Sequence, residues 1–364
     1  MAPGPSPGFD PSFGLVDATR RMIRLCGRLS DGHAHDTAIA QTPADTIWRD
    51  GKITLSRYRP LVDTPRLGPV LAFQGLIGRQ TMLDLEPGRS LVRRLLAAGV
   101  DLYALDWGSP TRADRCRDMA DCAVDTLADA LDAMLYASGA ARGVLFGVCQ
   151  GGTFAACHAA LEPERVKGLA LAVAPIDFHA DRASATPGQL NHWLRRIPDG
   201  LIERLIAQDG NVSGTLTAHA LNALAPGRWA TRYTADLAEI AEDPAALQTF
   251  LRMERWLADR PDQPGALART WLVELYRENR LVEGRFLLDG RRVDLGAIAC
   301  PVLNVYARDD HIVPPPCSTA LSQHLRNVAY RAVEVPTGHI GVFVSKRAQP
   351  IVAPAMVAWL QHVG

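Results

Sequence analysis

A cysteine flanked by glycines lies at residues 147–151, where the sequence reads GVCQG after a short apolar run. An apolar run, a glycine-flanked turn and a helix-forming TFAA stretch are together typical of a nucleophile elbow, in which a buried strand turns sharply into a helix. Gly147 and Gly151 suit such a turn, because a Cβ at either position would clash with neighbouring chain. The turn would place the sulfur of Cys149 near a helix N-terminus, whose partial positive charge favours a thiolate. Taken alone, the motif is also compatible with a small buried cysteine, since serine is the usual residue at this position.

Two further residue types complete a nucleophilic arrangement late in the chain. Asp309 and Asp310 follow one apolar run, and His339 follows another. Nucleophile, acid and histidine in this order are typical of α/β-hydrolases, and both late positions lie just past a predicted strand end. Since the loops after parallel strands meet at one edge of the sheet, we expect the three loops to converge. The sequence therefore predicts a triad of Cys149, His339 and Asp310, with Asp309 solvated.

The chemistry of a thiol explains why each partner is needed. An ordinary thiol has a pKa of about 8.5 and is mostly protonated at neutral pH, so the histidine must accept its proton. The aspartate then orients the imidazole and stabilises its cationic form. For the oxyanion we expect the backbone N–H of Gln150 and one from the glycine-rich loop that contains Leu76 and Ile77. That loop follows an apolar run at 69–73 and could equally be an ordinary strand-to-helix turn.

Alternating apolar runs and helical patterns indicate the elements that position these residues. Strands are predicted at 69–73, 100–108, 143–148, 168–174, 300–307 and 330–334, after a hairpin with Asp50-Gly51 at its turn. Their nearly all-apolar character favours a mostly parallel, doubly wound sheet covered on both faces, which is an α/β-hydrolase fold. Between 180 and 294 the alternation stops, and helical patterns with four tryptophans predict a helical cap. The expected domains are a flexible leader and helix at 1–45, a core at 46–179 and 295–364, and the cap at 180–294.

Composition limits the classes of partner. The 364 residues carry a formal net charge of +0, which does not favour nucleic acid or an anionic membrane. The seven cysteines form neither a CxxC pair nor a zinc-type cluster, so we expect no disulfide framework and no metal. We also expect no cofactor. The Pro- and Gly-rich start lacks the features of a signal peptide, and no run reaches the length of a membrane span. We therefore expect a cytoplasmic protein.

The stretches around these residues resemble poly(3-hydroxyalkanoate) synthases, most of all the catalytic subunit (PhaC type) of the two-component, class III enzymes. The similarity covers the chain from about residue 46 onward and is carried by YALDWGSP at 103–110, GVCQGG at 147–152, FLRMERW at 250–256, PDQ at 261–263, DHIVPP at 310–315 and GHIGVFVS at 338–345. The cap stretches are the most specific, because elbows and triads are shared by many hydrolases. Where the class III pattern has Asn-Arg-Pro, this chain has Gly78-Arg79-Gln80, and residues 1–45 show no match.

The resemblance implies a role for each motif. Cys149 would receive the acyl group of a short-chain (R)-3-hydroxyacyl-CoA, such as 3-hydroxybutyryl-CoA, and hold the growing polyester as a thioester while CoA is released. His339 would activate the thiol, and Asp310 would help to deprotonate the hydroxyl of the incoming monomer. Trp107 and His311, which lie in matching stretches, are expected to bind substrate. The resemblance further implies a second synthase subunit (PhaE type), a homodimer and residence at the surface of polymer granules.

Two other functions remain compatible with these residues. A cysteine hydrolase, such as an intracellular polyhydroxyalkanoate depolymerase or a thioesterase, would share the triad and use water as the acceptor. A non-catalytic granule-associated protein on the same fold would keep the residues without using them. The match in the cap argues against the hydrolase, and the intact triad argues against the non-catalytic protein.

Overall fold

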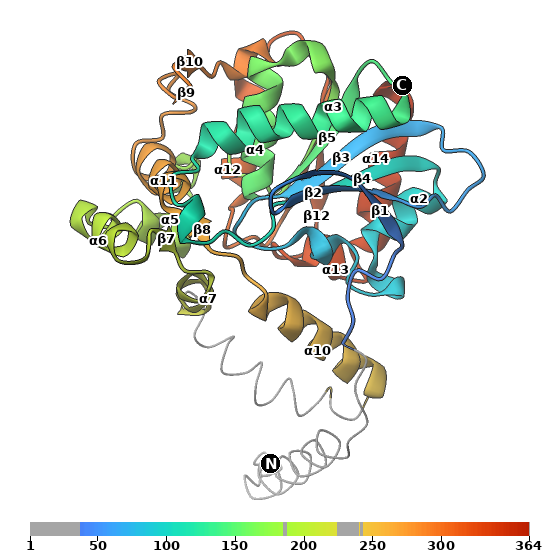
Figure 1. Ribbon diagram of the computed structural model, residues 1–364, viewed down its shortest axis with the longest axis horizontal. Coiled ribbons are helices and arrows are strands. Elements are labelled where there is room, and N and C mark those ends of the chain that lie inside the picture. Colours follow the sequence, from blue (N-terminus) through green and yellow to red (C-terminus); the bar gives the residue numbers. More distant parts are fainter. Residues whose placement is uncertain (1–36, 185–187, 224–239, 241–242, 364) are drawn as a thin grey trace, which may run out of the picture. The chain divides into compact units, whose positions relative to one another are not determined.

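The computed structural model describes residues 37–184, 188–223, 240 and 243–363 (Figure 1). The chain divides into two compact units, one made of Met1–Ala38 with Ala220–Arg255 and the other of Ile39–His219 with Trp256–Gly364. All residues of the predicted site belong to the second, larger unit. Of the predicted leader, only residues 37–45 lie within the described part, and its expected helix lies outside it.

An eight-stranded sheet forms the centre of the larger unit (Figure 1). In sheet order its strands are β1 (Ala44–Asp50), β2 (Ile53–Tyr58), β4 (Val100–Asp106), β3 (Leu67–Gln74), β5 (Gly143–Val148), β6 (Val166–Ala172), β11 (Val302–Ala307) and β12 (Tyr330–Val335). Strands β1 and β2 pair antiparallel at one edge, β2 joins β4 antiparallel, and the other neighbours are parallel. This topology confirms the predicted, mostly parallel α/β sheet.

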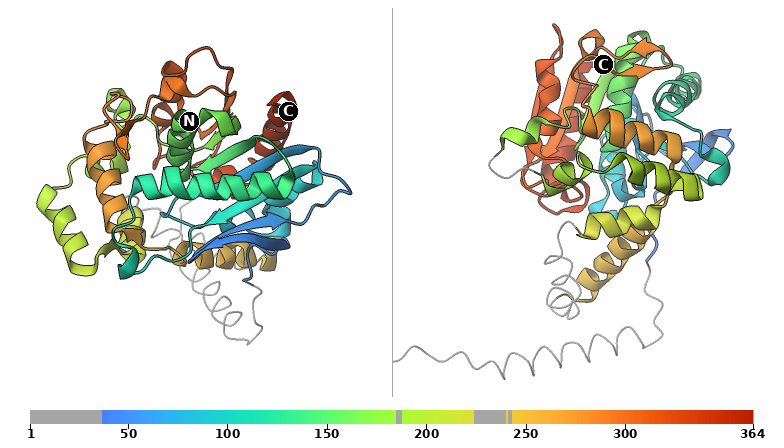
Figure 2. Two further views of the ribbon diagram at one scale, coloured as in Figure 1. Left: turned by 45° about the horizontal axis from the view of Figure 1, so that its top comes forward. Right: turned by 90° about the vertical axis from the view of Figure 1, so that its left-hand side faces the viewer.

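Helices cover both faces of this sheet, as the apolar strands require. The helices α2 (Leu91–Ala97) and α14 (Gln349–Val363) contact each other and the strands, while α3 (Leu127–Ser138) and α4 (Gln150–Leu161) lie on the opposite face (Figures 1 and 2). Strand β5 is buried at every residue because it lies between these layers. Two short helices, α12 (Pro315–Thr319) and α13 (Gly341–Val344), follow β11 and β12.

The insert between the strands β6 and β11 contains mostly helices. They are α5 (Gln189–Leu194), α6 (Asp199–Asp209), α7 (Gly214–Ala223), α10 (Pro244–Ala258) and α11 (Gly265–Arg269). Two short antiparallel pairs accompany them, β7 (Asn211–Val212) with β8 (Gln263–Pro264) and β9 (Leu287–Leu288) with β10 (Arg291–Arg292). Trp256 and Trp271 are buried and Trp193 is exposed, whereas Trp229 lies outside the described residues. The expected boundaries of a cap at 180–294 stay a prediction.

Three local details differ from the sequence-based expectation. The hairpin turn is Gly51-Lys52, one residue later than expected, because Asp50 still pairs with Ile53. The helical stretch before β5 contains a π-helical segment, Asp121–Thr126, before it continues as α3. A second π-helical segment, Thr270–Arg277, continues α11. Such segments often lie near functional sites, and the second one carries Tyr276 toward the site described below.

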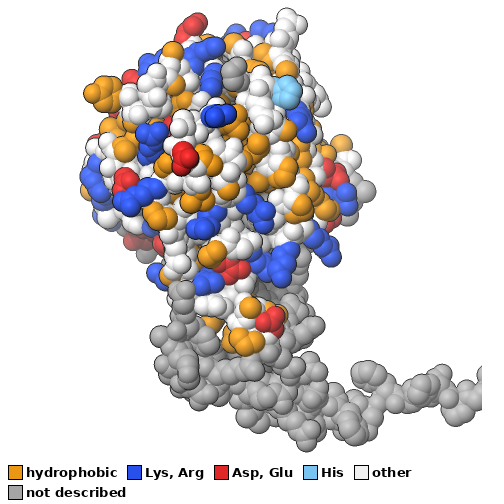
Figure 3. Space-filling view, turned by 90° about the vertical axis from the view of Figure 1, so that its right-hand side faces the viewer, with side chains coloured by type: hydrophobic (Ala, Val, Ile, Leu, Met, Phe, Trp, Pro, Cys, Tyr) orange, Lys and Arg blue, Asp and Glu red, His pale blue; other side chains and the backbone are white. Residues whose placement is uncertain are grey.

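The mixture of charged side chains on the surface agrees with the formal net charge of +0. On the face shown in Figure 3, basic, acidic and apolar side chains are interspersed over the described part of the larger unit. None of the helices within the described ranges has the length and apolar character needed to cross a bilayer.

Candidate active site

The turn between β5 and α4 has the geometry of the elbow expected from the sequence. Cys149 lies between strand and helix with φ 52° and ψ −122°, a conformation that strains any residue with a side chain. Close packing maintains this strain: a Cβ on Gly147 would lie 2.5 Å from the carbonyl oxygen of Gly151. Only glycine therefore allows the strand and the helix to meet this closely.

Asp310 and His339 lie in the loops after β11 and β12. Nδ1 of His339 is 2.7 Å from Oδ2 of Asp310, and both side chains are buried. The other carboxylate oxygen accepts backbone N–H groups from Ile312 at 2.9 Å and Val313 at 2.8 Å, which fixes the carboxylate toward the imidazole. Asp309 is exposed, as expected. The structure therefore selects Asp310 from the two adjacent carboxylates as the partner of His339.

The environment of His339 strongly favours the charged imidazolium. Burial alone lowers the pKa of His339, but the Asp310 carboxylate, which is bonded to its Nδ1, and the nearby Cys149 sulfur raise its pKa to about 10. The Cys149 sulfur therefore lies within the electrostatic range of the imidazole. Cys149, His339 and Asp310 thus converge from three strand ends, although their catalytic role remains a prediction.

The loop of residues 75–79 after β3, together with the start of α4, forms what we call the oxyanion side of Cys149. The side chain of Gln150 occupies it. The N–H of Leu76 donates to Oε1 of Gln150 at 2.8 Å, and Gln150 is completely buried at the start of α4. A Cβ on Gly75 would lie 2.5 Å from Cβ of Gln150, so a glycine is needed beside this amide. The carbonyl of Ile77 accepts from Nη1 of Arg260 at 2.8 Å. In this arrangement the Leu76 amide is not free to receive an oxyanion.

Comparison with known proteins identifies the family. Residues 68–346 match the family model of the alpha/beta hydrolase fold. The chain is 36% identical to the poly(3-hydroxyalkanoate) polymerase subunit PhaC of Synechocystis, over 95% of this chain and 92% of that protein. It is 34% identical to the subunit of the same name from Allochromatium vinosum, over 96% of each. This chain belongs to the poly(3-hydroxyalkanoate) polymerase family.

Solved structures support the fold of this family member but not its activity. The monoacylglycerol lipase of Paleococcus ferrophilus matches with a TM-score of 0.50 and 16% identity, covering 86% of this chain and 99% of the lipase. The non-heme bromoperoxidase BpoC of Mycobacterium tuberculosis matches with a TM-score of 0.51 and 19% identity, covering 91% and 100%. Identities this low show a shared fold alone.

The two predicted substrate residues lie in different surroundings. Trp107 is buried, donates from Nε1 to the carbonyl of Gln74 at 2.5 Å, and meets Phe154 edge to face at 6.0 Å. It also lines, with Leu76, a cavity of about 150 Å³. His311 is exposed. Trp107 thus packs at the end of β3, and substrate contact by either residue stays a prediction.

One stretch of the insert contacts the oxyanion side at several points. Nε1 of Trp256 donates to the carbonyl of Arg79 at 2.9 Å, and Asp259 pairs with the guanidinium of Arg79 at 3.0 Å. Arg260 binds the neighbouring Ile77, and Gln263 accepts from the side-chain amide of Gln150 at 3.3 Å. The sequence identified parts of this stretch only by resemblance. Its role emerges from contacts between residues far apart in the chain.

Tyr276 also lies near the site and was not singled out from the sequence. Burial raises the pKa of its phenol, and the sulfurs of Cys149 and Cys317 act in the same direction, which places the ring near the nucleophile. The ring meets Phe178 edge to face at 4.8 Å. A tyrosine in a predicted helix gives no local signal of such a position, because a buried core residue shows the same pattern.

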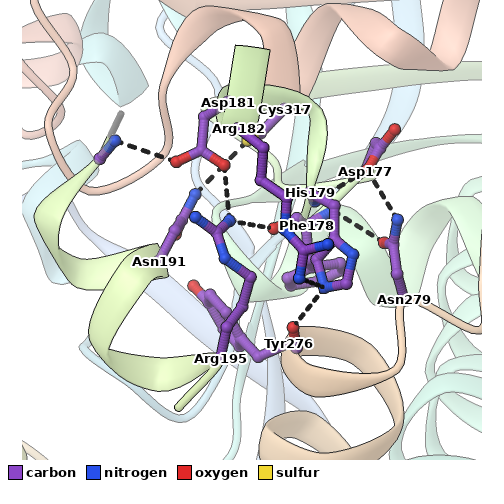
Figure 4. A network of polar contacts seen from close by, with 11 residues as sticks. Asp177, Phe178, His179, Asp181, Arg182, Asn191, Arg195, Tyr276, Asn279 and Cys317 are labelled. Atoms are coloured by element: carbon purple, nitrogen blue, oxygen red, sulfur yellow. Dashed lines mark hydrogen bonds and ion pairs between the residues drawn. The ribbon is translucent and has the colours of Figure 1, made fainter. Parts of the chain in front are cut away.

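A buried polar network joins the segment that follows β6 to later parts of the insert (Figure 4). Asp181 and Arg195 form an ion pair at 2.6 Å, with 0% and 6% of their side chains exposed. Arg195 also donates to the carbonyl of Phe178 at 2.8 Å, and Asn279 donates to Asp177 at 2.8 Å. Removing one member of a buried pair destabilises a protein strongly, since the other charge is left unpaired. The network therefore fixes α5 and the π-helical segment beside the site.

Proposed function

We propose that this chain is the catalytic subunit of a poly(3-hydroxyalkanoate) polymerase, which transfers short-chain (R)-3-hydroxyacyl groups from CoA to a growing polyester. The observation that carries the proposal is the buried Cys149–His339–Asp310 arrangement at a strained elbow in a member of this polymerase family. The enzyme is an acyltransferase that carries its intermediate on the cysteine. No cofactor is proposed, since CoA is part of the substrate.

The geometry supports a mechanism in two halves. Because Nδ1 of His339 is bonded to Asp310, Nε2 is the nitrogen that accepts the proton of the Cys149 thiol. The sulfur then attacks the thioester carbonyl, the oxyanion lies near the N–H of Gln150, and CoA leaves with the proton from His339. In the second half, the hydroxyl of an acceptor gives its proton to His339 and attacks the new thioester. The cysteine is free again, and the acceptor is one unit longer.

Burial favours transfer to a hydroxyl over transfer to water. Cys149, Asp310 and His339 are 7%, 6% and 8% exposed. A site this enclosed limits the water available for hydrolysis of the acyl-enzyme. A depolymerase or thioesterase would need regular access for water to the same sulfur, so the enclosure favours the polymerase.

The partners are also proposals. The relatives are named as subunits, which supports a second synthase subunit of the PhaE type. Homodimerisation and residence at the granule surface rest on the family resemblance. Co-purification with the second subunit, and sedimentation of this chain alone, would test the first two.

The decisive experiment follows CoA release and polymer formation from (R)-3-hydroxybutyryl-CoA. We expect Cys149→Ala to abolish both, and Cys116→Ala, which changes an exposed cysteine, to leave both unchanged. Free 3-hydroxybutyrate in place of polymer would make the protein a hydrolase. CoA release at the normal rate by Cys149→Ala would contradict the covalent mechanism and favour a non-catalytic role for the site.

A further inference from the structure

Arg260 lies between α10 and β8, beside the oxyanion side of the cysteine. Its Nη1 donates to the carbonyl of Ile77 at 2.8 Å, and its guanidinium lies 5.8 Å from the centre of the Trp256 ring. Its Nε is inaccessible to solvent and makes no hydrogen bond with any part of the chain that the structure describes. A buried N–H donor without an acceptor is unfavourable by itself and suits a group that binds a ligand.

The charge of Arg260 lacks a carboxylate to balance it. Arg79, which binds the same loop region, pairs with Asp106 at 3.5 Å and Asp259 at 3.0 Å. Arg260 has no such ion pair within residues 37–184, 188–223 and 243–363. Burial lowers the pKa of the Arg260 guanidinium, and the sulfur of Cys149 opposes that effect, so the sulfur lies within the electrostatic range of the guanidinium. Arg260 is partly buried, and a partly buried charge without a counter-ion is unfavourable, which an anion bound beside it would offset.

The neighbouring backbone donor is already in use. The N–H of Leu76 is bonded to Oε1 of Gln150 at 2.8 Å, and the other end of that side-chain amide is bonded to Gln263 at 3.3 Å. The oxyanion side therefore presents one expected backbone donor that is occupied and one guanidinium donor that is not. The two donors meet the loop after β3 at adjacent residues. Leu76 carries the occupied N–H, and the carbonyl of Ile77 accepts a hydrogen bond from Arg260.

We propose that Arg260 is a catalytic residue whose Nε–H donates to the acyl oxygen while the Cys149 sulfur attacks the thioester carbonyl. This proposal rests on the proposed polymerase function and adds a residue to it. As the sulfur–carbon bond forms, the π-electron pair of the carbonyl moves to oxygen and is stabilised by the guanidinium, which stays protonated throughout. The pair returns when the bond to the CoA sulfur breaks, and CoA leaves with the proton held by His339.

The first test measures the charge beside the sulfur without any turnover. Alkylation of Cys149 by iodoacetate and by iodoacetamide is followed by mass spectrometry of its peptide, and the ratio of the two rates reports the local positive charge. We expect Arg260→Gln to lower this ratio about three- to tenfold, and Arg260→Lys to keep it within about twofold. Trp256→Phe removes a hydrogen bond to the same loop without changing charge, so the ratio should not change. An unchanged ratio in folded Arg260→Gln would overturn the proposal.

The second test measures the chemical step with (R)-3-hydroxybutyryl-CoA. We expect Arg260→Gln to lower kcat for CoA release about 10- to 100-fold while KM changes less than about threefold, because the contact forms as charge develops on oxygen. A normal kcat in this variant would overturn the catalytic role even if the alkylation ratio falls. Absence of any turnover by the unmodified protein would instead refute the proposed function, and the alkylation ratio would still decide whether Arg260 acts on the sulfur.

Discussion

The two sides of Cys149 are built in different ways. On the base side, Asp310 and His339 come from loops of the core sheet, and their 2.7 Å hydrogen bond is already formed. On the oxyanion side, the loop after β3 is bound by the side chain of Gln150 and by residues 256–263 of the insert. The base side thus depends on the sheet alone, whereas the oxyanion side also depends on the insert. We infer that the oxyanion side is the part of a fold shared with hydrolases where an insert can alter the reaction.

The largest expected effect tests the base side. Asp310→Asn removes the negative charge that orients His339 and stabilises its cation, so we expect the rate of CoA release to fall about 10³- to 10⁴-fold. Asp309→Asn is a matched control at the next residue and should change the rate less than about twofold, because Asp309 is exposed. Equal effects of the two substitutions would show that the base side does not depend on the Asp310–His339 contact.

The next effect tests the oxyanion side. Gly75→Ala introduces a Cβ that would lie 2.5 Å from Cβ of Gln150, so the loop and the side-chain amide must move apart. We expect a loss of about 10- to 100-fold in kcat and a loss of about 1–3 kcal/mol in the free energy of unfolding. Gly88→Ala is the control, because a Cβ there meets no atom within 4 Å. Normal kinetics in Gly75→Ala would mean that the position of this loop is unimportant for catalysis.

The pH dependence of stability tests the base side in another way. The folded protein raises the pKa of His339 to about 10 from an ordinary value of about 6.5. The imidazolium therefore contributes stability that is fully present below pH 6.5 and is lost as the pH rises toward 10. We expect His339→Gln to destabilise the protein at pH 6.5 by about 1 kcal/mol or more, and progressively less at higher pH, as measured by urea unfolding. A difference that grows with pH would contradict the charged pair.

The smallest effect concerns the link between the insert and the elbow. Gln263→Leu removes the acceptor of the Gln150 side-chain amide and leaves that donor without its 3.3 Å partner. The amide is then able to turn away from Leu76, so we expect kcat to rise by no more than about threefold while stability falls by about 1 kcal/mol. Steady-state CoA release and urea unfolding measure the two changes. A large loss of activity would indicate that Gln150 must stay in place during the reaction.

The positions of the main site residues could be predicted because local patterns determine them. Short apolar runs mark the buried strands, and the loops after parallel strands share one edge, so Cys149, Asp310 and His339 could be expected together. The preference for Asp310 over Asp309 agrees with the structure, where the backbone amides of Ile312 and Val313 hold the chosen carboxylate. The two π-helical segments could not be predicted, because a stretch of six or eight residues is too short to distinguish their period from that of an α-helix.

The sequence by itself determined the fold class, the elbow and the order of nucleophile, acid and base, because each depends on neighbouring residues and on general rules of sheet topology. Only the tertiary structure decided that Gln150 occupies the amide of Leu76 and that Arg260 binds the carbonyl of Ile77. The first pair lies 74 positions apart in the chain and the second 183 positions apart. Contacts of that range leave no periodicity or spacing in the sequence, since they exist only after distant parts of the chain have packed together.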